Sequence, residues 1–423
     1  MLSFPTERHV LDNGLTVVLA PDPAVPVVAV NLWYGVGSRN ERPGRTGFAH
    51  LFEHMMFQGS KHVPKNRHFE LVERAGGSLN ATTWFDRTNY FQTLPSHHLE
   101  LALWLESDRM GFFVEALTRE TLENQQGVVL NERKERYENQ PYGDWDERML
   151  RLVWPPEHAY HHTVIGEKAD IAAATLEDVE GFFRTFYVPN NAVLTLAGDL
   201  DPARALAAVE RWFGPIPAGA PVPPIPGLVD PGPVVGGAPR ETVEADVPLP
   251  RVYLGARIPP ATDPEFYAAD LATSILGDGR ASRLYRRLVR ERRVARDAVS
   301  FAFPLVHGRT MMLSWITGFP GADPAVLEAA LLAEVEGLAD VTEAEVARAR
   351  ALAETRLLSQ VAQLATRADL LSMNQLLFGD AARLNSEVER MRAVTADDVR
   401  RFAAAFLRPD NRALLTYLPG EAA

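Results

Sequence analysis

Two histidines and a glutamate lie near the N-terminus in a spacing that suits metal chemistry. His50 and His54 are four residues apart and Glu53 lies between them, in the run GFAHLFEHMMF. On a helix, residues four apart share one face, so the two imidazoles could bind one ion. The chain has no cysteine, so any metal must be held by His, Asp and Glu. Two imidazoles and one distant carboxylate would leave zinc an open position for water, and Glu53 would act on that water as a general base.

The alternative is a pair of surface or core histidines with a chance glutamate between them. The neighbours of the motif favour the metal. They are apolar and predict a buried helix: Ala49, Leu51, Phe52, Met55 and Met56. Histidines and a glutamate on a buried helix need polar partners or a metal ion.

The third protein ligand is expected from a second predicted helix, residues 120–138. Its candidate carboxylates are Glu123, Glu132, Glu135 and Glu138. Most of them are expected on a solvated face. Glu132 differs because it follows the apolar run GVVL, which would carry that part of the helix into the core. Spacing alone does not choose between Glu132 and Glu135.

The elements that must position these residues form a duplicated domain. Residues 214–240 are dense in proline and glycine and predict a linker between residues 1–213 and residues 241–423. The run that begins at Thr175 and ends at Asn191 recurs 220 residues later, from Thr395 to Asn411. A second set agrees at the same offset: Ala49, Leu51 and Gly59 with Ala269, Leu271 and Gly279. Two independent matches predict homologous halves.

Each half mixes strands and helices, so the predicted fold class is α+β. Residues 16–19, 27–34 and 88–94 are rich in β-branched and aromatic side chains and predict strands. Residues 46–57 and 99–113 predict helices, and residues 342–377 predict a long helix that is broken once.

Composition excludes several classes of protein. The 423 residues include 43 Lys and Arg against 55 Asp and Glu, a net charge of −12 that argues against a nucleic-acid partner. No run approaches the roughly 18 apolar residues of a membrane span, and the first residues do not read as a signal peptide. The expected location is the cytoplasm, or the periplasm or the exterior if a leader was removed.

The motifs together resemble the inverted zincins of the pitrilysin family, M16, in its mitochondrial-processing-peptidase-like branch, M16B. The similar segments are LDNGL at 11–15, GSRNE at 37–41, HLFEH at 50–54 and GGSLNA at 76–81. The resemblance implies a zinc endopeptidase of unfolded peptides or presequences. In it His50 and His54 bind zinc, Glu53 activates water and Glu132 completes the site. The half-domains would enclose a substrate chamber, the second half being inactive.

The resemblance also implies a substrate-binding strand near residues 79–83, with Asn80 and Ala81 beside the scissile bond. For Asn80 the alternative is a turn residue after Gly76 and Gly77. One departure concerns Gln125, where the family commonly has a second glutamate seven residues before the ligand. The neutral amide could keep a hydrogen-bond network but not the charge.

The second half lacks the metal motif, because the 220-residue offset carries the three motif residues onto Asp270, Thr273 and Ser274. The family's distal half often supplies an arginine and a tyrosine after a Ser-Arg-Leu-Tyr-like helix. That helix is present at 282–285, but the two positions hold Val289 and Arg296, and a one-residue shift would offer only Arg290. We therefore hypothesise a catalytic subunit paired with a metal-free homologue, a heterodimer. A homodimer, a non-catalytic scaffold and a purely structural metal site are the alternatives.

Overall fold

The computed structural model describes residues 3–420, which form two compact units. The first contains residues 3–132, 164–226 and 357–387, and the second contains residues 133–163, 227–356 and 388–420. Each unit thus contains segments from both sides of residues 214–240, the linker that the sequence predicts. Residues 133–163 pack with the second unit and residues 357–387 with the first, because the helix in the latter segment covers strands of the first sheet. The predicted halves, residues 1–213 and 241–423, are defined by sequence repetition and not by packing, so their boundaries stay a prediction.

The sheet of the first unit has six strands in the order β1-β2-β6-β3-β5-β4. The strands are β1 (Glu7–Val10), β2 (Thr16–Pro21), β3 (Val27–Tyr34), β4 (Ser78–Thr83), β5 (Thr88–Pro95) and β6 (Ala192–Gly198). Strands β2 and β6 are parallel, and the other neighbours are antiparallel. All but the first residue of β3 are buried, which explains its nearly continuous apolar sequence.

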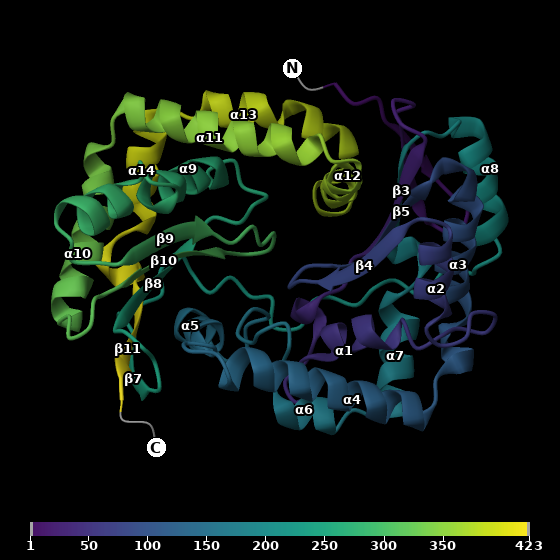
Figure 1. Cartoon of the computed structure of the whole chain (residues 1–423), viewed down its shortest axis with the longest axis horizontal. Helices are drawn as coiled ribbons and strands as arrows, with labels where there is room; N and C mark the ends of the chain where they lie inside the picture. Colours follow the sequence, from purple (N-terminus) through teal and green to yellow (C-terminus); the bar gives the residue numbers. More distant parts are fainter. Residues whose placement is uncertain (1–2, 421–423) are drawn as a thin grey trace. The chain divides into compact units, whose positions relative to one another are not determined.

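Helices cover both faces of this sheet. The helices of the unit are α1 (Phe48–Met55), α2 (Arg67–Arg74), α3 (Leu99–Phe112), α4 (Arg119–Arg133, whose last residue is assigned to the second unit), α6 (Lys168–Ala172), α7 (Leu176–Phe186), α8 (Pro202–Phe213) and α12 (Leu364–Phe378). Helix α12 packs on β3 and β6, and α3 packs on β3 and β5 (Figure 1). Strand β5 bonds both helices: Asn89 donates to Asp369 of α12, and Gln92 donates to Glu106 of α3. Residues three apart on a strand point to opposite faces, so the two helices lie on opposite sides of the sheet.

The sheet of the second unit repeats this topology with one strand fewer. Its order is β7-β11-β8-β10-β9, with β7 and β11 parallel. The strands are β7 (Arg240–Ala245), β8 (Arg251–Ile258), β9 (Asp297–Ala302), β10 (Thr310–Thr317) and β11 (Ala413–Pro419). The five strands correspond in order to β2, β6, β3, β5 and β4, which agrees with the duplication that the sequence predicts.

The helices of the second unit pack on its sheet, and most of them contribute to one apolar core. They are α5 (Trp145–Val153), α9 (Phe266–Gly277), α10 (Pro324–Glu336), α11 (Glu343–Val361), α13 (Glu387–Ala393) and α14 (Ala396–Phe406); α11 and α13 cross a unit boundary. Core side chains such as Leu254, Leu271, Leu331 and Phe402 are at most 1% exposed. Burial of such side chains is the main stabilising term of the unit.

The duplicated segments share local structure. Helices α7 and α14 both begin with a capping box, in which Thr175 pairs with Asp178 and Thr395 with Asp398. Such boxes satisfy backbone N–H groups at the helix start that have no partner within the helix. The predicted long helix of residues 342–377 is broken once, between α11 and α12. Within residues 3–420, no helix is both long and apolar enough to cross a membrane.

Candidate metal centre

Helix α1 carries the two histidines, and a buried carboxylate fixes its first turn. Glu41 accepts hydrogen bonds from the backbone N–H of Gly47, at 2.8 Å, and of Ala49, at 2.7 Å. Negative charge is favoured at a helix N-terminus. Gly47 has φ 82°, and a Cβ there would lie 2.4 Å from the Ile165 carbonyl oxygen, so only glycine fits. The start of α1 is therefore held on two sides.

The apolar face of α1 orients its histidines. Phe52 packs against Phe113 and Tyr187, with ring centroids 5.2 and 4.2 Å apart. The five apolar neighbours of the motif are at most 2% exposed, which confirms the predicted buried helix. With that face in the core, the side chains of His50 and His54 remain 12% and 24% exposed on the other face.

Glu132 of α4 meets both imidazoles. Its Oε2 lies 3.7 Å from Nε2 of His50 and 3.5 Å from Nε2 of His54, and three possible ligand atoms of these residues lie within 4.8 Å of one another. Tetrahedral zinc with bonds of about 2.0–2.1 Å separates its ligand atoms by about 3.4 Å. The two distances are within a few tenths of an ångström of that value, so this donor set fits zinc.

The structure separates the two glutamates that spacing could not. Glu132 is half-buried near the end of α4, whereas Glu135 is exposed in a π-helical segment, Lys134–Glu138, that follows. Of the apolar run before Glu132, Val129 is buried but Val128 is 42% exposed. The expectation that the whole run enters the core is therefore wrong; α4 is amphipathic there, and only one side of it is covered.

Glu53 lies next to the histidines, half-buried and beside polar side chains. Its Oε2 accepts a hydrogen bond of 2.5 Å from the hydroxyl of Thr83, the last residue of β4. Burial raises the pKa of Glu53, while the Thr83 hydrogen bond and the charges of His54 and Arg87 oppose that rise. A raised pKa suits a carboxylate that must hold a proton briefly at neutral pH. Sequence reasoning gave Thr83 no role; the clue was its position two residues after the buried Ala81, on the same face of a strand.

Strand β4 lies at the edge of the first sheet, where β5 is its one partner among residues 3–420. Asn80 and Ala81 lie within this strand, so the alternative of a turn residue for Asn80 is wrong; the turn is at Gly76 and Gly77. Asn80 is exposed and accepts from the N–H of Ala81 through its own side chain, while Ala81 is 5% exposed. An exposed edge next to Glu53 can accept a further strand.

Known proteins are similar to this chain over most of its length. Residues 16–150 match the family described as insulinase (peptidase family M16), and residues 173–352 match the peptidase M16 inactive domain. The zinc protease PqqE of Helicobacter pylori is 31% identical over 344 residues, which are 80% of this chain and 76% of that protein. The chain belongs to peptidase family M16.

Two further relatives extend the M16 comparison. The crystal structure of a protease from Helicobacter pylori has a TM-score of 0.91 at 27% identity and covers 99% of this chain and 100% of that one. The mitochondrial-processing peptidase subunit beta of Blastocladiella emersonii is 28% identical over 221 residues, 52% of this chain and 47% of that protein. The M16 fold thus extends over both units.

Gln125, where M16 proteins commonly have a glutamate, lies on α4 two turns before Glu132. It is 6% exposed, and its amide N–H donates to Asn124 at 2.8 Å. A buried amide at this position is satisfied locally by the neighbouring side chain.

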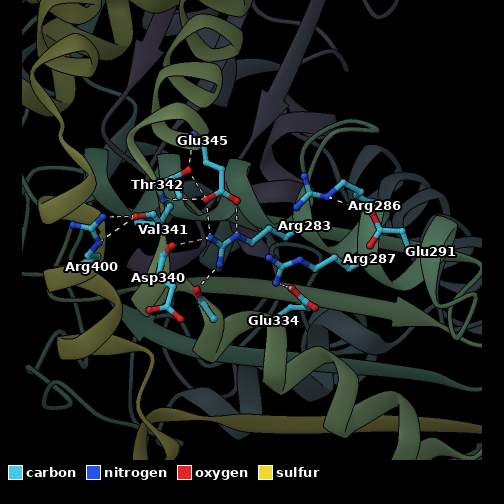
Figure 2. Close-up of polar contacts among 11 residues, drawn as sticks. Arg283, Arg286, Arg287, Glu291, Glu334, Asp340, Val341, Thr342, Glu345 and Arg400 are labelled. Atoms are coloured by element: carbon cyan, nitrogen blue, oxygen red, sulfur yellow. Dashed lines mark hydrogen bonds and ion pairs between the residues drawn. The ribbon is translucent and has the colours of Figure 1, made fainter.

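The Ser-Arg-Leu-Tyr segment of the second unit makes structural contacts with the start of α11. Arg283 is 3% exposed and makes two 2.7 Å hydrogen bonds to the carboxylate of Glu345 (Figure 2). Glu345 in turn accepts from the N–H and hydroxyl of Thr342, at the start of α11. Val289 packs against the core and Arg296 is exposed. The positions at which the family often has arginine and tyrosine thus hold a core side chain and a surface side chain.

Proposed function

We propose that this M16 protein is a zinc-dependent endopeptidase of unfolded peptides or presequences. The observation that supports this most directly is the meeting of His50, His54 and Glu132 beside a second carboxylate, Glu53, that is not needed as a ligand. A scaffold has no need for a general base held next to three ligands. The printed names of several relatives, zinc protease among them, agree with this proposal.

In the proposed reaction, His50, His54 and Glu132 would hold the zinc. When bound there, zinc would lower the pKa of a water and polarise the scissile carbonyl. Glu53 accepts the proton of the attacking water and passes it to the leaving amine. Thr83 holds one oxygen of Glu53 by a hydrogen bond, which leaves the other oxygen for the proton transfer.

Strand β4 supplies the substrate site in this proposal. An extended peptide adds to its free edge through backbone hydrogen bonds, with Asn80 and Ala81 next to the scissile bond. Backbone recognition is insensitive to side chains, which suits a peptidase of unfolded segments.

We further propose that the active form is a dimer with a metal-free homologue, or with a second copy. The support is the Val289 and Arg296 pair, which leaves the second unit without the family's arginine and tyrosine, together with the relative that is a named subunit of a processing peptidase. The alternative function is a non-catalytic scaffold, which the match of residues 173–352 to an inactive domain favours.

The test is zinc content together with cleavage of a quenched peptide library. The wild-type chain is compared with Glu53→Gln and with the matched control Glu135→Gln, an exposed glutamate one residue after Lys134. Glu53→Gln is expected to keep about one zinc per chain and to lose at least about 100-fold in kcat, whereas Glu135→Gln keeps both.

Each further outcome separates the alternatives. Activity of the chain alone contradicts the requirement for a partner, and activity only with an added homologue supports it. Zinc without activity in either state supports the scaffold. Unfolding of the chain when a chelator removes the zinc supports a structural metal.

A further inference from the structure

An aspartate of α12 gathers polar side chains from two strands of the first sheet. Oδ1 of Asp369 accepts hydrogen bonds from Asn31 at 3.1 Å, from the indole N–H of Trp33 at 2.8 Å and from Asn89 at 3.0 Å. All three donors are at most 2% exposed. A buried donor without an acceptor costs about 1–3 kcal/mol. Loss of this one carboxylate oxygen would therefore leave three buried donors without the acceptor that they share.

Asn89 continues this network to the edge strand. Its Oδ1 accepts from the hydroxyl of Thr82 at 2.5 Å and from Arg87 at 3.2 Å. Arg87 also donates to the carbonyl oxygen of Thr82 at 2.9 Å and lies 5.0 Å from the Trp33 ring centroid. Burial lowers the pKa of Arg87, and the nearby carboxylates of Asp369 and Glu53 oppose that change. The polar side of β4 is therefore tied to α12 through Asn89.

The other side of β4 reaches Glu53. Thr82 and Thr83 are consecutive residues of one strand, so their side chains point to opposite faces. Thr82 bonds Asn89, and Thr83 bonds Glu53. Thr82 and Thr83 also pair with consecutive residues of β5, Asn89 and Thr88, so a slip of β4 that displaces Thr82 displaces Thr83 as well.

We propose that Asp369 is a positioning residue, which fixes β4 and, through Thr83, the orientation of Glu53. This inference rests on the proposed peptidase function and adds to it a side chain more than 280 residues from the metal helix in sequence. The route consists of Asp369, Asn89, Thr82 and Thr83, each step being a hydrogen bond or a peptide bond.

The competing explanation is that Asp369 merely attaches α12 to the sheet. The same helix offers a matched control for that role. Ser372, one turn further along α12, is fully buried and shares a 2.7 Å hydrogen bond with Thr195 of β6. It attaches α12 to the sheet but has no hydrogen bond to β4 or β5 among those of the described residues.

The experiment measures kcat and KM for Asp369→Ala, Asp369→Asn and Ser372→Ala in the whole zinc-loaded protein, with the homologue if activity needs it. Asp369→Ala is expected to lower kcat roughly tenfold, Asp369→Asn by less because an acceptor oxygen remains, and Ser372→Ala by under about twofold. In a Thr83→Val background, Asp369→Ala should add less than about twofold. Additive losses, or an equal loss in Ser372→Ala, would overturn the inference.

A second readout does not depend on activity. Hydrogen exchange of the backbone amides of residues 78–83 is measured in metal-free protein. Exchange is expected to be faster in Asp369→Ala and unchanged in Ser372→Ala. If the wild-type protein hydrolyses no peptide, the proposed function fails, but this measurement still decides the inference; unchanged exchange in Asp369→Ala contradicts it.

Discussion

The two units place different chemistry at corresponding positions. In the first, His50, Glu53 and His54 of α1 face Glu132 of α4. In the second, the residues 220 positions later on α9 are Asp270, Thr273 and Ser274, and the same offset carries Glu132 onto Leu352 of α11, which is 39% exposed. One turn beyond Leu352, Arg356 pairs with Asp278 at the end of α9.

The difference lies in the source of positive charge. The first site collects two imidazoles and the carboxylate of Glu132, a donor set that suits a metal cation. The second unit supplies its own cation: Arg356 pairs with Asp278. Burial raises the pKa of Asp270, and the charge of Arg356 opposes that rise. The same scaffold thus holds a set of side chains that suits a metal ion in one unit and an ion pair between its own side chains in the other.

The largest difference between the two units should appear when a proposed metal ligand of the first unit is removed. His54→Ala leaves two of three protein ligands, so zinc content should fall from about one per chain to near zero and activity by at least about 100-fold. Metal analysis and peptide cleavage measure both. Ser274→Ala, the change at the corresponding position, should alter neither; a loss of zinc there would contradict the assignment of a single metal centre.

Removing the fixed cation should destabilise the second unit moderately. Arg356→Leu removes the partner of Asp278, in a pair whose side chains are 54% and 32% exposed, and the cation whose charge acts on Asp270, so we expect a loss of about 0.5–1 kcal/mol in the free energy of unfolding. Denaturant unfolding measures it. The control is Arg401→Leu, which breaks an exposed pair with Asp398 and should cost under about 0.5 kcal/mol.

The ion pair between Arg283 and Glu345 in the second unit should make the stability of the protein depend on pH in acid. The hydrogen bond from Arg283 lowers the pKa of Glu345 from 4.5 to about 2. A lowered folded-state pKa stabilises the protein above the unfolded-state pKa, so this contribution is complete above about pH 4.5 and is lost as the pH falls through about 2. In unfolding experiments at stepped pH, the free energy of unfolding should fall between about pH 4.5 and 2 by about 1–2 kcal/mol less in Glu345→Gln than in the wild-type protein. The exposed Glu291→Gln should leave the slope unchanged.

Small effects are expected from the two helix caps, and they should be nearly equal in the two units. Thr175→Ala and Thr395→Ala remove the same helix cap from α7 and α14, and each should cost about 1 kcal/mol. Thermal unfolding of both variants, with Thr→Ser as the retained-cap control, compares them. Clearly unequal costs would show that the duplicated helices have come to depend on different contacts.

Much of the first unit follows from local sequence. The spacing of His50 and His54 and the apolar neighbours of α1 predict a buried helix with one polar face, because both patterns depend on a helical period alone. The capping boxes are equally local. The strand at residues 27–34 is predicted by its β-branched and aromatic composition.

The choice of Glu132 and the course of α12 depend on distant contacts. Spacing left Glu132 and Glu135 open, because the π-helical segment that turns Glu135 to solvent has no clear sequence signal. The sequence of α12 predicts a helix, but nothing in it shows that β3 and β6, more than 160 residues earlier, are its partners. Thr83 and Asp369 were missed for the same reason.

The crossing of α12 into the first unit also bears on how the protein is made. A ribosome releases the strands and the metal-binding helix long before residues 357–387 emerge, so the face of β3 and β6 must wait uncovered during most of synthesis. A fragment that stops at residue 226 would end in that state. The nascent chain therefore cannot complete the first unit until residues 357–387 have been synthesised, so this unit finishes folding late in translation.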